Sequence, residues 1–374
     1  MVRRAAVVLS LLAIASCAER GTRDVYRSKV SGAEPPARSG EPVVGATQDV
    51  ARAPAARAYR VVGRSSPDAG GGVRFAWSGS RVEARFYGTA LDVVLEDPGS
   101  NAFEVVLDGA GIARILAEPG VRTYHAVTGA PPGEHTVAIV KRTEAMVGEA
   151  VFRGFVTPEG SRFLGATTPR KRSIELVGDS ITAALGAEGD DPCTPPRLSQ
   201  DSFRSYGEIA ARALDADVVN LSWSGVRAAG PAPTMADLYP LALPRDPTTV
   251  VNVPDPAPDA VVVNLGDNDD FWSPGAADRF HEDYVRFVRS LRARYPEALV
   301  LCTTGPMGTG SSEAARRTIA RAVRTLSDPR IFYLEFSPID AAKEGLGCGS
   351  HPTLKTHARM AETLRAELAK HLGW

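Results

Sequence analysis

The chain has 374 residues, of which 44% are hydrophobic and 23% charged, and its formal net charge is −1. This length is enough for two domains, and the composition is that of an ordinary globular protein. A near-neutral charge balance without clustered Lys and Arg excludes the electrostatic surface that nucleic-acid binding needs, so we expect no nucleic-acid partner.

The N-terminus has the pattern of an export signal. Arg3 and Arg4 precede an apolar stretch over residues 5–15, which is too short for a bilayer-spanning helix of about 20 residues. The small residues before Cys17 resemble the lipobox of bacterial lipoproteins, in which that cysteine is lipidated. We therefore interpret residues 1–17 as a lipoprotein signal peptide with Cys17 as the lipidation site. The alternative is an ordinary cleaved signal with an incidental Cys17.

Either reading predicts an exported protein. With lipidation, the chain contacts the membrane through its lipid anchor only. Ala18 rather than Asp follows the cysteine, which favours the outer membrane of a bacterium; without lipidation, the protein is secreted. Residues 18–55 carry few large apolar side chains, and we expect a flexible tether that packs on nothing.

Residues 56–165 predict an all-β domain. Val82, Ala84 and Phe86 alternate with charged residues, as in half-buried strands, and Asp108-Gly109 marks a hairpin turn. Many short strands with close turns and no helical pattern favour a jelly roll or sandwich. The expected strands cover residues 73–77, 81–86, 91–95, 103–107, 123–127, 135–141 and 151–156.

Residues 170–374 predict an α/β domain, because apolar strands alternate with helical stretches. This rhythm indicates a parallel sheet covered by helices on both faces, with ligands bound beyond the C-terminal strand ends. The expected strands cover residues 174–177, 218–221, 260–265, 298–302 and 331–334. The expected helices cover residues 203–214, 276–294, 313–326 and 353–372.

Candidate catalytic residues follow these strand ends. Ser180 comes directly after the first strand and is expected to open a helix, Gly225 follows the second strand, and Asn268 follows the third. His351 stands before the last helix. A serine needs a neighbouring imidazole to accept its proton, and acyl transfer needs N–H donors for the oxyanion.

In order and spacing, these blocks resemble the SGNH (GDSL-type) hydrolases. The resemblance extends to carbohydrate esterase family 2, through Lys141–Ala145, Gly305–Met307 and Gly347–Pro352. It implies a β jelly roll before a three-layer α/β/α hydrolase domain, and hydrolysis of O-acetyl esters on a polysaccharide or oligosaccharide. Ser180 would be the nucleophile and His351 the base, with Ser180, Gly225 and Asn268 forming the oxyanion hole. Neither a metal nor an organic cofactor is implied.

Two positions depart from the SGNH pattern. An acid usually stands two or three residues before the histidine, where this chain has Cys348 and Gly349. Either a backbone carbonyl orients His351, or Asp340 or Glu344 reaches in. Asp267 stands where Thr is commoner, and we expect its carboxylate to point away from the oxyanion site.

Besides Cys17, the chain has Cys193, Cys302 and Cys348, so at least one of them is free or paired outside the chain. Cys302 lies in an apolar strand and is expected to be buried. Cys193 and Cys348 lie in loops near the candidate catalytic residues. A disulfide between them is one possibility, and two free thiols are the other.

The remaining polar and aromatic residues are assigned no catalytic role. Lys141–Ala145 is read as a charged strand end, and the pairs Asp190-Asp191 and Asp269-Asp270 as solvated loops. Trp223 fits core packing or sugar stacking equally well, and Trp272 is expected to be more exposed. Two rival functions stay open: a lipid esterase or thioesterase of the same superfamily, and a non-catalytic glycan-binding surface lipoprotein.

Overall fold

The computed structural model describes residues 42–47, 59–189, 193–251 and 256–374, which belong to one compact unit. The expected signal peptide, Cys17 and most of the expected tether lie outside the described residues. Within the tether range, β1 (Val43–Val44) and β2 (Ala46–Thr47) each pair with a strand of the following domain. The prediction that residues 18–55 pack on nothing is therefore wrong at this point, because these strands complete open sheet edges.

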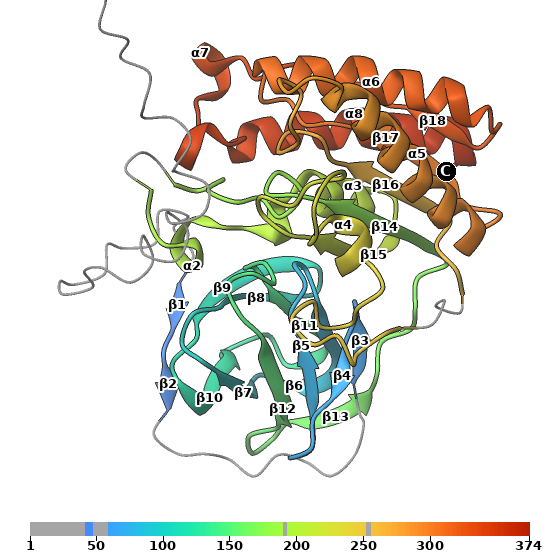
Figure 1. Ribbon diagram of the computed structural model, residues 1–374. Coiled ribbons are helices and arrows are strands. Elements are labelled where there is room, and N and C mark those ends of the chain that lie inside the picture. Colours follow the sequence, from blue (N-terminus) through green and yellow to red (C-terminus); the bar gives the residue numbers. More distant parts are fainter. Residues whose placement is uncertain (1–41, 48–58, 190–192, 252–255) are drawn as a thin grey trace, which may run out of the picture. The chain divides into compact units, whose positions relative to one another are not determined.

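The N-terminal domain is a sandwich of two β-sheets (Figure 1). Except for β1, which is parallel to its neighbour, the paired strands of both sheets are antiparallel. The first sheet has the order β1, β9 (Ala110–Leu116), β8 (Ala102–Leu107), β11 (Gly133–Lys141), β6 (Arg81–Gly88) and β13 (Arg162–Gly165), with β3 (Arg60–Val62) also paired to β6. The second has the order β2, β10 (Gly120–Val127), β7 (Leu91–Asp97), β12 (Ala150–Val156), β5 (Val73–Phe75) and β4 (Ser66–Pro67).

Strand β6 shows how this sandwich is buried on both sides. Its predicted apolar face lies in the core between the sheets, with Val82, Ala84 and Phe86 fully buried. The opposite face was expected to meet water, but Arg81 and Glu83 are buried as well. They belong to an ion-pair group that includes Asp217 of the C-terminal domain. The second face of β6 is therefore a domain interface.

The C-terminal domain is built on a parallel sheet. Its strands have the order β15 (Ala216–Ser222), β14 (Arg172–Gly178), β16 (Ala260–Asn264), β17 (Leu299–Thr303) and β18 (Ile331–Tyr333). All neighbouring pairs are parallel. The chain therefore moves from β14 to one neighbour, β15, and then crosses to the other, β16. This reversal is a topological switch point, where open α/β sheets bind their ligands.

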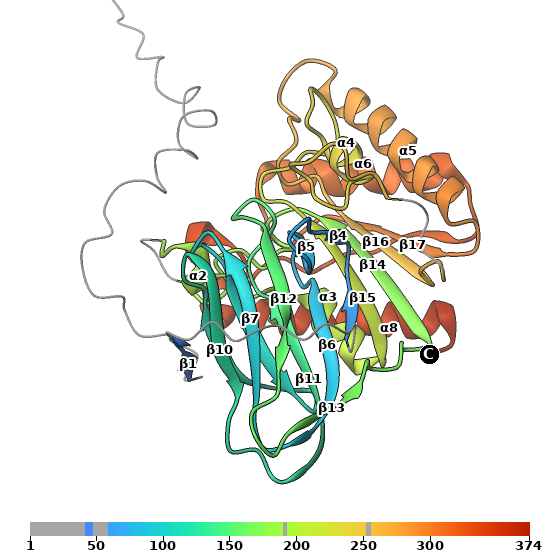
Figure 2. The same ribbon diagram turned by 90° about the horizontal axis from the view of Figure 1, so that it is seen from below.

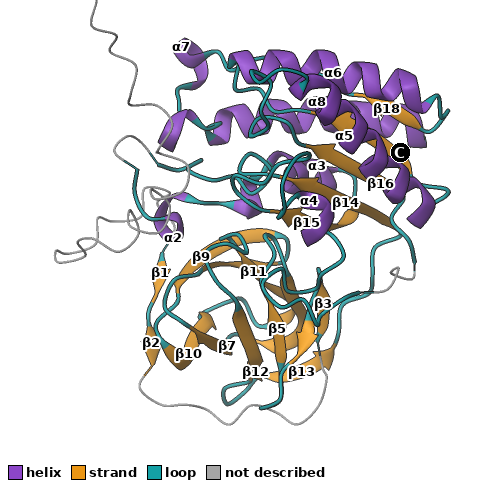
Figure 3. Ribbon diagram, viewed as in Figure 1, coloured by secondary structure: helices purple, strands orange, loops and turns teal. Residues whose placement is uncertain are grey.

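Helices cover both faces of the parallel sheet, as Figures 2 and 3 show. Helices α5 (Ala276–Arg294) and α6 (Gly310–Leu326) pack on one face, and α3 (Tyr206–Ala213) and α8 (Leu354–Leu372) pack on the other. The strands are apolar on both sides, so alternate residues such as Val261 and Val262 enter different cores. The predicted β domain followed by a three-layer α/β/α domain is confirmed. Short helical turns complete the domain: α2 (Pro196–Ser199), η1 (Ser202–Arg204), α4 (Met235–Leu238), α7 (Ala341–Glu344) and η2 (Cys348–Ser350).

A buried group of charges joins the two domains, and we call it the Arg142 cluster. Its members come from both domains: Glu104, Arg114, Arg142, Glu188, Asp201 and Arg204. Arg142 directly follows β11 and is completely buried. Its Nη2 lies 2.8 Å from Glu188 Oε2 and 3.0 Å from Asp201 Oδ2, and its Nη1 contacts Glu104.

Arg142 remains charged in this setting. Burial acts to lower the pKa of Arg142, but the carboxylates of Asp201, Glu188 and Glu104 raise it above its ordinary value. Removing one partner of a buried ion pair leaves the others uncompensated in a medium of low dielectric constant, which is strongly unfavourable. The cluster therefore makes each domain depend on the other for stability.

We predict that Arg142→Met lowers the free energy of unfolding by about 3–5 kcal/mol, because the buried carboxylates lose their central cation. Urea denaturation with the disulfide intact measures this change. The control is Arg286→Met, since Arg286 pairs with Asp283 on the surface; this change is expected to remove less than about 1 kcal/mol. Equal effects of the two substitutions would contradict a stabilising role of the cluster.

Candidate active site

The candidate residues gather at one edge of the parallel sheet. Gly178 at the end of β14 is level with Ser222 of β15 and with Asn264 of β16. The segments that follow these strands therefore leave the sheet side by side, at the topological switch point. They carry Ser180, Gly225 and Asn268 in turn.

Ser180 lies in a tight series of turns beyond β14. Its side chain is nearly buried, with 7% of the residue exposed. The expected helix does not form here: residues 180–188 are hydrogen-bonded turns. Ala184 has a positive φ of 56°, which interrupts helical geometry. The serine is thus held by turn hydrogen bonds and not by a helix N-terminus.

His351 lies within hydrogen-bonding distance of the serine. His351 Nε2 is 2.8 Å from Ser180 Oγ, and His351 Nδ1 is 2.9 Å from the carbonyl oxygen of Cys348. A carbonyl oxygen only accepts hydrogen bonds, so Nδ1 carries the ring proton and Nε2 is left to accept one. This tautomer allows His351 to take the proton of the Ser180 hydroxyl.

A backbone carbonyl therefore occupies the position of the usual acid. Of the two acids that the sequence left open, Asp340 accepts a hydrogen bond from the Lys343 N–H at the start of α7. Glu344 binds Arg359 and the hydroxyl of Thr356. Both carboxylates are thus engaged elsewhere.

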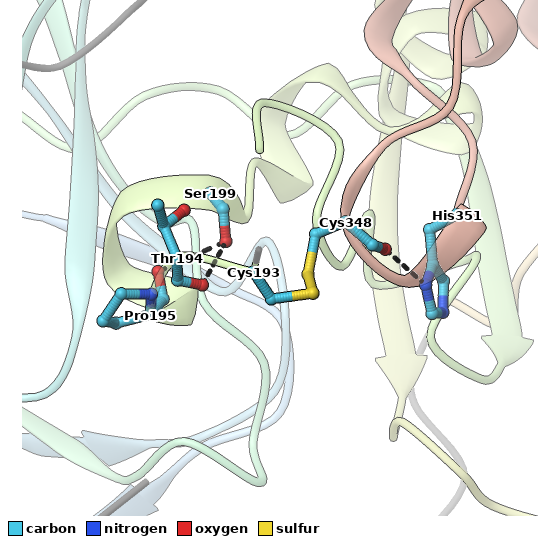
Figure 4. The surroundings of a disulfide bond; sticks show 6 residues. All are labelled: Cys193, Thr194, Pro195, Ser199, Cys348 and His351. Carbon is cyan, nitrogen blue, oxygen red and sulfur yellow. Dashed lines mark hydrogen bonds between the residues drawn. A yellow bond between two sulfur atoms is a disulfide. The ribbon is translucent and has the colours of Figure 1, made fainter. Parts of the chain in front are cut away.

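A disulfide fixes the segment that supplies this carbonyl (Figure 4). Cys193 and Cys348 are bonded, with their Cα atoms 4.9 Å apart, and Cys302 is a buried free thiol. The Cys348 N–H also donates to the Gly186 carbonyl (3.1 Å), and the Gly347 N–H donates to the His351 carbonyl (2.8 Å). Cys348 is therefore held through its side chain and its backbone while its carbonyl holds the imidazole.

The surroundings of His351 favour its neutral form. Burial lowers the pKa of His351 below its ordinary value of 6.5, while the Cys348 carbonyl and the charge of Asp267 oppose this shift. Asp267 accepts hydrogen bonds from Gly305 N (2.9 Å) and Thr304 Oγ1 (3.1 Å), and also from Ser312 Oγ. Its carboxylate is thus bound to the segment after β17, and its negative charge also favours an imidazolium at His351.

Gly225 occupies a turn that suits an oxyanion donor. Its φ is 76°, in the left-handed region that favours glycine. The residue is exposed, and a Cβ atom placed on it would meet nothing within 4 Å. The turn is closed by the Val226 N–H, which donates to the Trp223 carbonyl at 3.2 Å. The space beside the Gly225 α-carbon is therefore open.

Asn268 is exposed and bound through its amide group. Its Nδ2 donates to Asp179 Oδ2 at 3.1 Å and to the Val226 carbonyl at 3.2 Å. Asp179 is fully buried next to Ser180, and burial raises its pKa well above the ordinary value, with Asp267 raising it further. Both amide hydrogens thus have protein acceptors, and Asn268 can serve an oxyanion only if one of them turns toward the substrate.

One expected strand end and one residue of an acidic pair are buried, contrary to the expectation from the sequence, whereas Asp270 is exposed as expected. Lys141–Ala145, expected as a charged strand end, is at most 1% exposed throughout. Asp269, expected in a solvated loop, is buried and accepts hydrogen bonds from the N–H groups of Ala228 and Ala229. Burial raises the pKa of Asp269 to about 6. Asp190-Asp191 lies outside the described residues.

The two tryptophans near the site differ in exposure. Trp223 is partly buried and packs against the core between the sheet and α5. Trp272 is 77% exposed, on the loop that follows Asn268. An exposed indole beside an active site offers an apolar face for a ligand.

The described residues also bear on metal binding and on membrane spanning. Within these residues, no group of three or more His, Cys, Asp and Glu side chains is arranged to hold a metal ion. None of the helices described combines the length and the apolar character needed to cross a membrane.

Comparisons with known proteins agree with this architecture. Residues 61–166 match the family model "Carbohydrate esterase 2 N-terminal", and residues 176–359 match the "GDSL-like Lipase/Acylhydrolase family". The cellulase/esterase CelE of Acetivibrio thermocellus is 35% identical over 81% of this chain, but the chain spans only 38% of that relative's length. An acetylxylan esterase/glucomannan deacetylase of Cellvibrio japonicus is 27% identical, over 84% of this chain and 89% of its own length.

Solved structures extend the likeness to three dimensions. An active-site mutant of a family two carbohydrate esterase from Clostridium thermocellum has a TM-score of 0.80 and 33% identity, over 84% of this chain and 99% of its own. A second structure of such an esterase from the same organism, in complex with cellohexaose, has a TM-score of 0.77. With both family models matched and a 33% identical structure covered almost completely, the chain belongs to carbohydrate esterase family 2.

Proposed function

We propose that this chain is a serine esterase that hydrolyses O-acetyl esters on a carbohydrate through an acyl-enzyme. The observation that carries the proposal is the 2.8 Å contact between Ser180 Oγ and His351 Nε2. A hydroxyl becomes an effective nucleophile when an adjacent base is placed to take its proton. The acetylxylan esterase and glucomannan deacetylase relatives support acetylated glycans as the substrate class.

In this reaction, Ser180 Oγ attacks the acetyl carbonyl carbon while His351 Nε2 takes the hydroxyl proton. The tetrahedral intermediate collapses, the sugar oxygen leaves with that proton, and the acetyl group stays on Ser180. Water then attacks the acetyl-serine with His351 again as the base, which releases acetate and restores the hydroxyl. The N–H groups of Ser180 and Gly225 and the Asn268 amide are the proposed donors to the oxyanion, each typically worth about 3 kcal/mol of barrier.

The imidazolium formed in these steps has two sources of stabilisation. The Cys348 carbonyl accepts the hydrogen bond from Nδ1, and the nearby carboxylate of Asp267 favours the positive charge. A Ser–His pair oriented by the backbone is therefore sufficient for the proposed chemistry. No third acid is needed to select the tautomer.

Trp272 supports a glycan as the substrate. Its exposed indole follows the proposed oxyanion residue Asn268 by four positions. Sugar rings present apolar C–H faces that pack on aromatic rings, so a polysaccharide chain bound at the site has a surface on which to lie. A related esterase has been solved with cellohexaose, which supports a chain-like ligand.

The proposed site of action is outside the cell. The basic and apolar pattern of residues 1–17 supports export, and Cys17 in its lipobox-like setting supports attachment of a lipid anchor. We propose that the enzyme is tethered in this way to a bacterial membrane, with the outer membrane favoured by Ala18. The Cys193–Cys348 disulfide fits an oxidising compartment.

The first test compares hydrolysis of p-nitrophenyl acetate and p-nitrophenyl octanoate by the mature protein and by Ser180→Ala. We expect turnover of the acetate well above that of the octanoate, and its loss in the variant. The matched control is Ser273→Ala, which removes an exposed serine of a nearby loop and should leave turnover unchanged. Preference for octanoate would favour a lipid esterase, and no turnover by folded protein would favour a glycan-binding protein.

The pH dependence tests the role of His351. Only the neutral imidazole accepts the Ser180 proton, and its pKa is lowered below 6.5 by burial. We therefore predict that kcat/KM falls as the pH is lowered, with an apparent pKa below 6.5, and is flat between pH 7 and 8. Acetate release, corrected with the Ser180→Ala variant, gives this profile. An apparent pKa above 6.5 would contradict the assignment.

Asn268→Ala tests the side-chain donor. We expect kcat to fall by about a hundredfold to a thousandfold, as for the loss of one oxyanion donor. The thermal unfolding midpoint should change little, because Asn268 is exposed. Unchanged turnover would refute the donor role, and a large drop in the unfolding midpoint would show that Asn268 acts mainly by binding Asp179.

A further inference from the structure

Glu144 is a buried carboxylate from the β domain that reaches the hydrolase domain beside the proposed oxyanion site. It is completely buried, three residues after β11 ends. Its Oε2 accepts a hydrogen bond from the Ser224 N–H at 2.6 Å, and its Oε1 accepts one from the Ser224 hydroxyl. Both carboxylate oxygens are thus bound to the residue that precedes Gly225.

These two bonds act on the turn that carries Gly225. Residues Trp223 to Val226 form one tight turn, closed by the Val226 N–H on the Trp223 carbonyl. The Trp223 N–H donates to the Gly178 carbonyl at 3.1 Å, which links the turn to the nucleophile strand. Glu144 holds the turn at Ser224, and the direction of the next N–H, that of Gly225, follows from this attachment.

Glu144 is itself fixed on two sides. Its N–H donates to Gln200 Oε1 at 3.1 Å, and Gln200 Nε2 donates to the Ala183 carbonyl at 3.0 Å, within the turns that carry Ser180. On the β-domain side, Lys141 Nζ donates to the carbonyls of Thr143 and Glu144. Glu144 therefore connects the two turns: its N–H reaches the serine turns through Gln200, and its carboxylate binds the Gly225 turn at Ser224.

Burying the Glu144 carboxylate is energetically unfavourable unless its hydrogen bonds are kept. Burial raises the pKa of Glu144 above its ordinary value, although the hydrogen bonds from Ser224 and the charge of Lys141 oppose this shift. A buried carboxylate is tolerated only where donors replace water, and charge-assisted hydrogen bonds are stronger and shorter than neutral ones. An ionised Glu144 therefore holds Ser224 more firmly than a neutral acceptor would.

On the basis of the proposed esterase function, we propose that Glu144 is a positioning residue, which fixes the Ser224–Gly225 turn so that the Gly225 N–H meets the oxyanion. The β domain thereby completes the active site of the hydrolase domain. The carboxylate of Glu144 acts on the proposed oxyanion site through Ser224.

The test measures kcat, KM and the thermal unfolding midpoint for Glu144→Gln and Ser224→Ala. In Glu144→Gln the amide oxygen can still accept from the Ser224 N–H, but the amide NH2 must donate to the Ser224 hydroxyl, so both charge-assisted bonds are lost and the turn is held less firmly. A misplacement near 1 Å can reduce turnover by about a hundredfold. We expect kcat/KM with p-nitrophenyl acetate to fall by about tenfold to a hundredfold in Glu144→Gln, and by about tenfold in Ser224→Ala. The matched control is Glu149→Gln, since Glu149 lies five residues on and pairs with Arg74 in a half-buried ion pair; its kcat/KM should equal that of the wild type.

The affinity for phenylboronic acid separates a displaced oxyanion site from a general loss of stability. Phenylboronic acid forms a tetrahedral adduct on a serine, and its affinity reports how well the oxyanion site fits such a group. Across the wild type and the variants, the loss in kcat/KM should be matched by an equal loss in phenylboronic acid affinity. Should Glu144→Gln fail to fold, Ser224→Ala still makes the test, since it removes only one hydroxyl.

The outcomes are distinct. Wild-type turnover with parallel losses in the two variants supports the inference. If the wild type is active and kcat/KM of both variants stays within twofold of it, the positioning role is overturned but the proposed function stands. The same holds if the variants lose turnover while their affinity for phenylboronic acid is unchanged. A folded wild type without turnover overturns the proposed function and the inference that rests on it.

Discussion

The buried guanidinium of Arg142 is the interaction on which the rest of this structure depends. It has carboxylate partners in both domains, Glu104 in one and Glu188 and Asp201 in the other. Taking these charges out of water is unfavourable, and only their close mutual pairing offsets that cost. The segment 141–144 is thereby fixed in the interface, and Glu188 is fixed at the end of the Ser180 turns. The same buried charges thus stabilise the fold and fix the segments that shape the site.

The parallel sheet could be predicted from the sequence because its physical signal is local. The apolar run at residues 260–265 identifies a strand buried on both faces, and the structure places β16 at Ala260–Asn264. Polar residues after such runs must lie at one edge of the sheet, so Ser180, Gly225 and Asn268 could be grouped without knowledge of the fold.

The misread segments depend on partners that are distant in the sequence. Lys141–Glu144 is polar at every position, which normally indicates a solvated strand end. It is buried because Glu188, Asp201 and Ser224 provide charges and donors from 46, 59 and 80 positions further along the chain. No local pattern encodes this pairing. The same reasoning applies to Asp269, whose burial depends on the N–H groups of Ala228 and Ala229. The orientation of His351 was undecidable for a related reason, since any residue can supply a backbone carbonyl.

That carbonyl has an evolutionary consequence. A carboxylate that orients a histidine can be lost through a single codon change, whereas a main-chain oxygen persists whatever side chain stands at position 348. The position of this oxygen depends instead on the backbone path near it, which substitutions at nearby residues can change. A Cβ on Gly347 would lie 2.5 Å from the Gly186 oxygen, and one on Gly186 would lie 2.7 Å from Cys348 Cβ. Substitution of either glycine would displace the carbonyl, so two residues without side chains, together with the Cys193–Cys348 disulfide, determine how the imidazole is oriented.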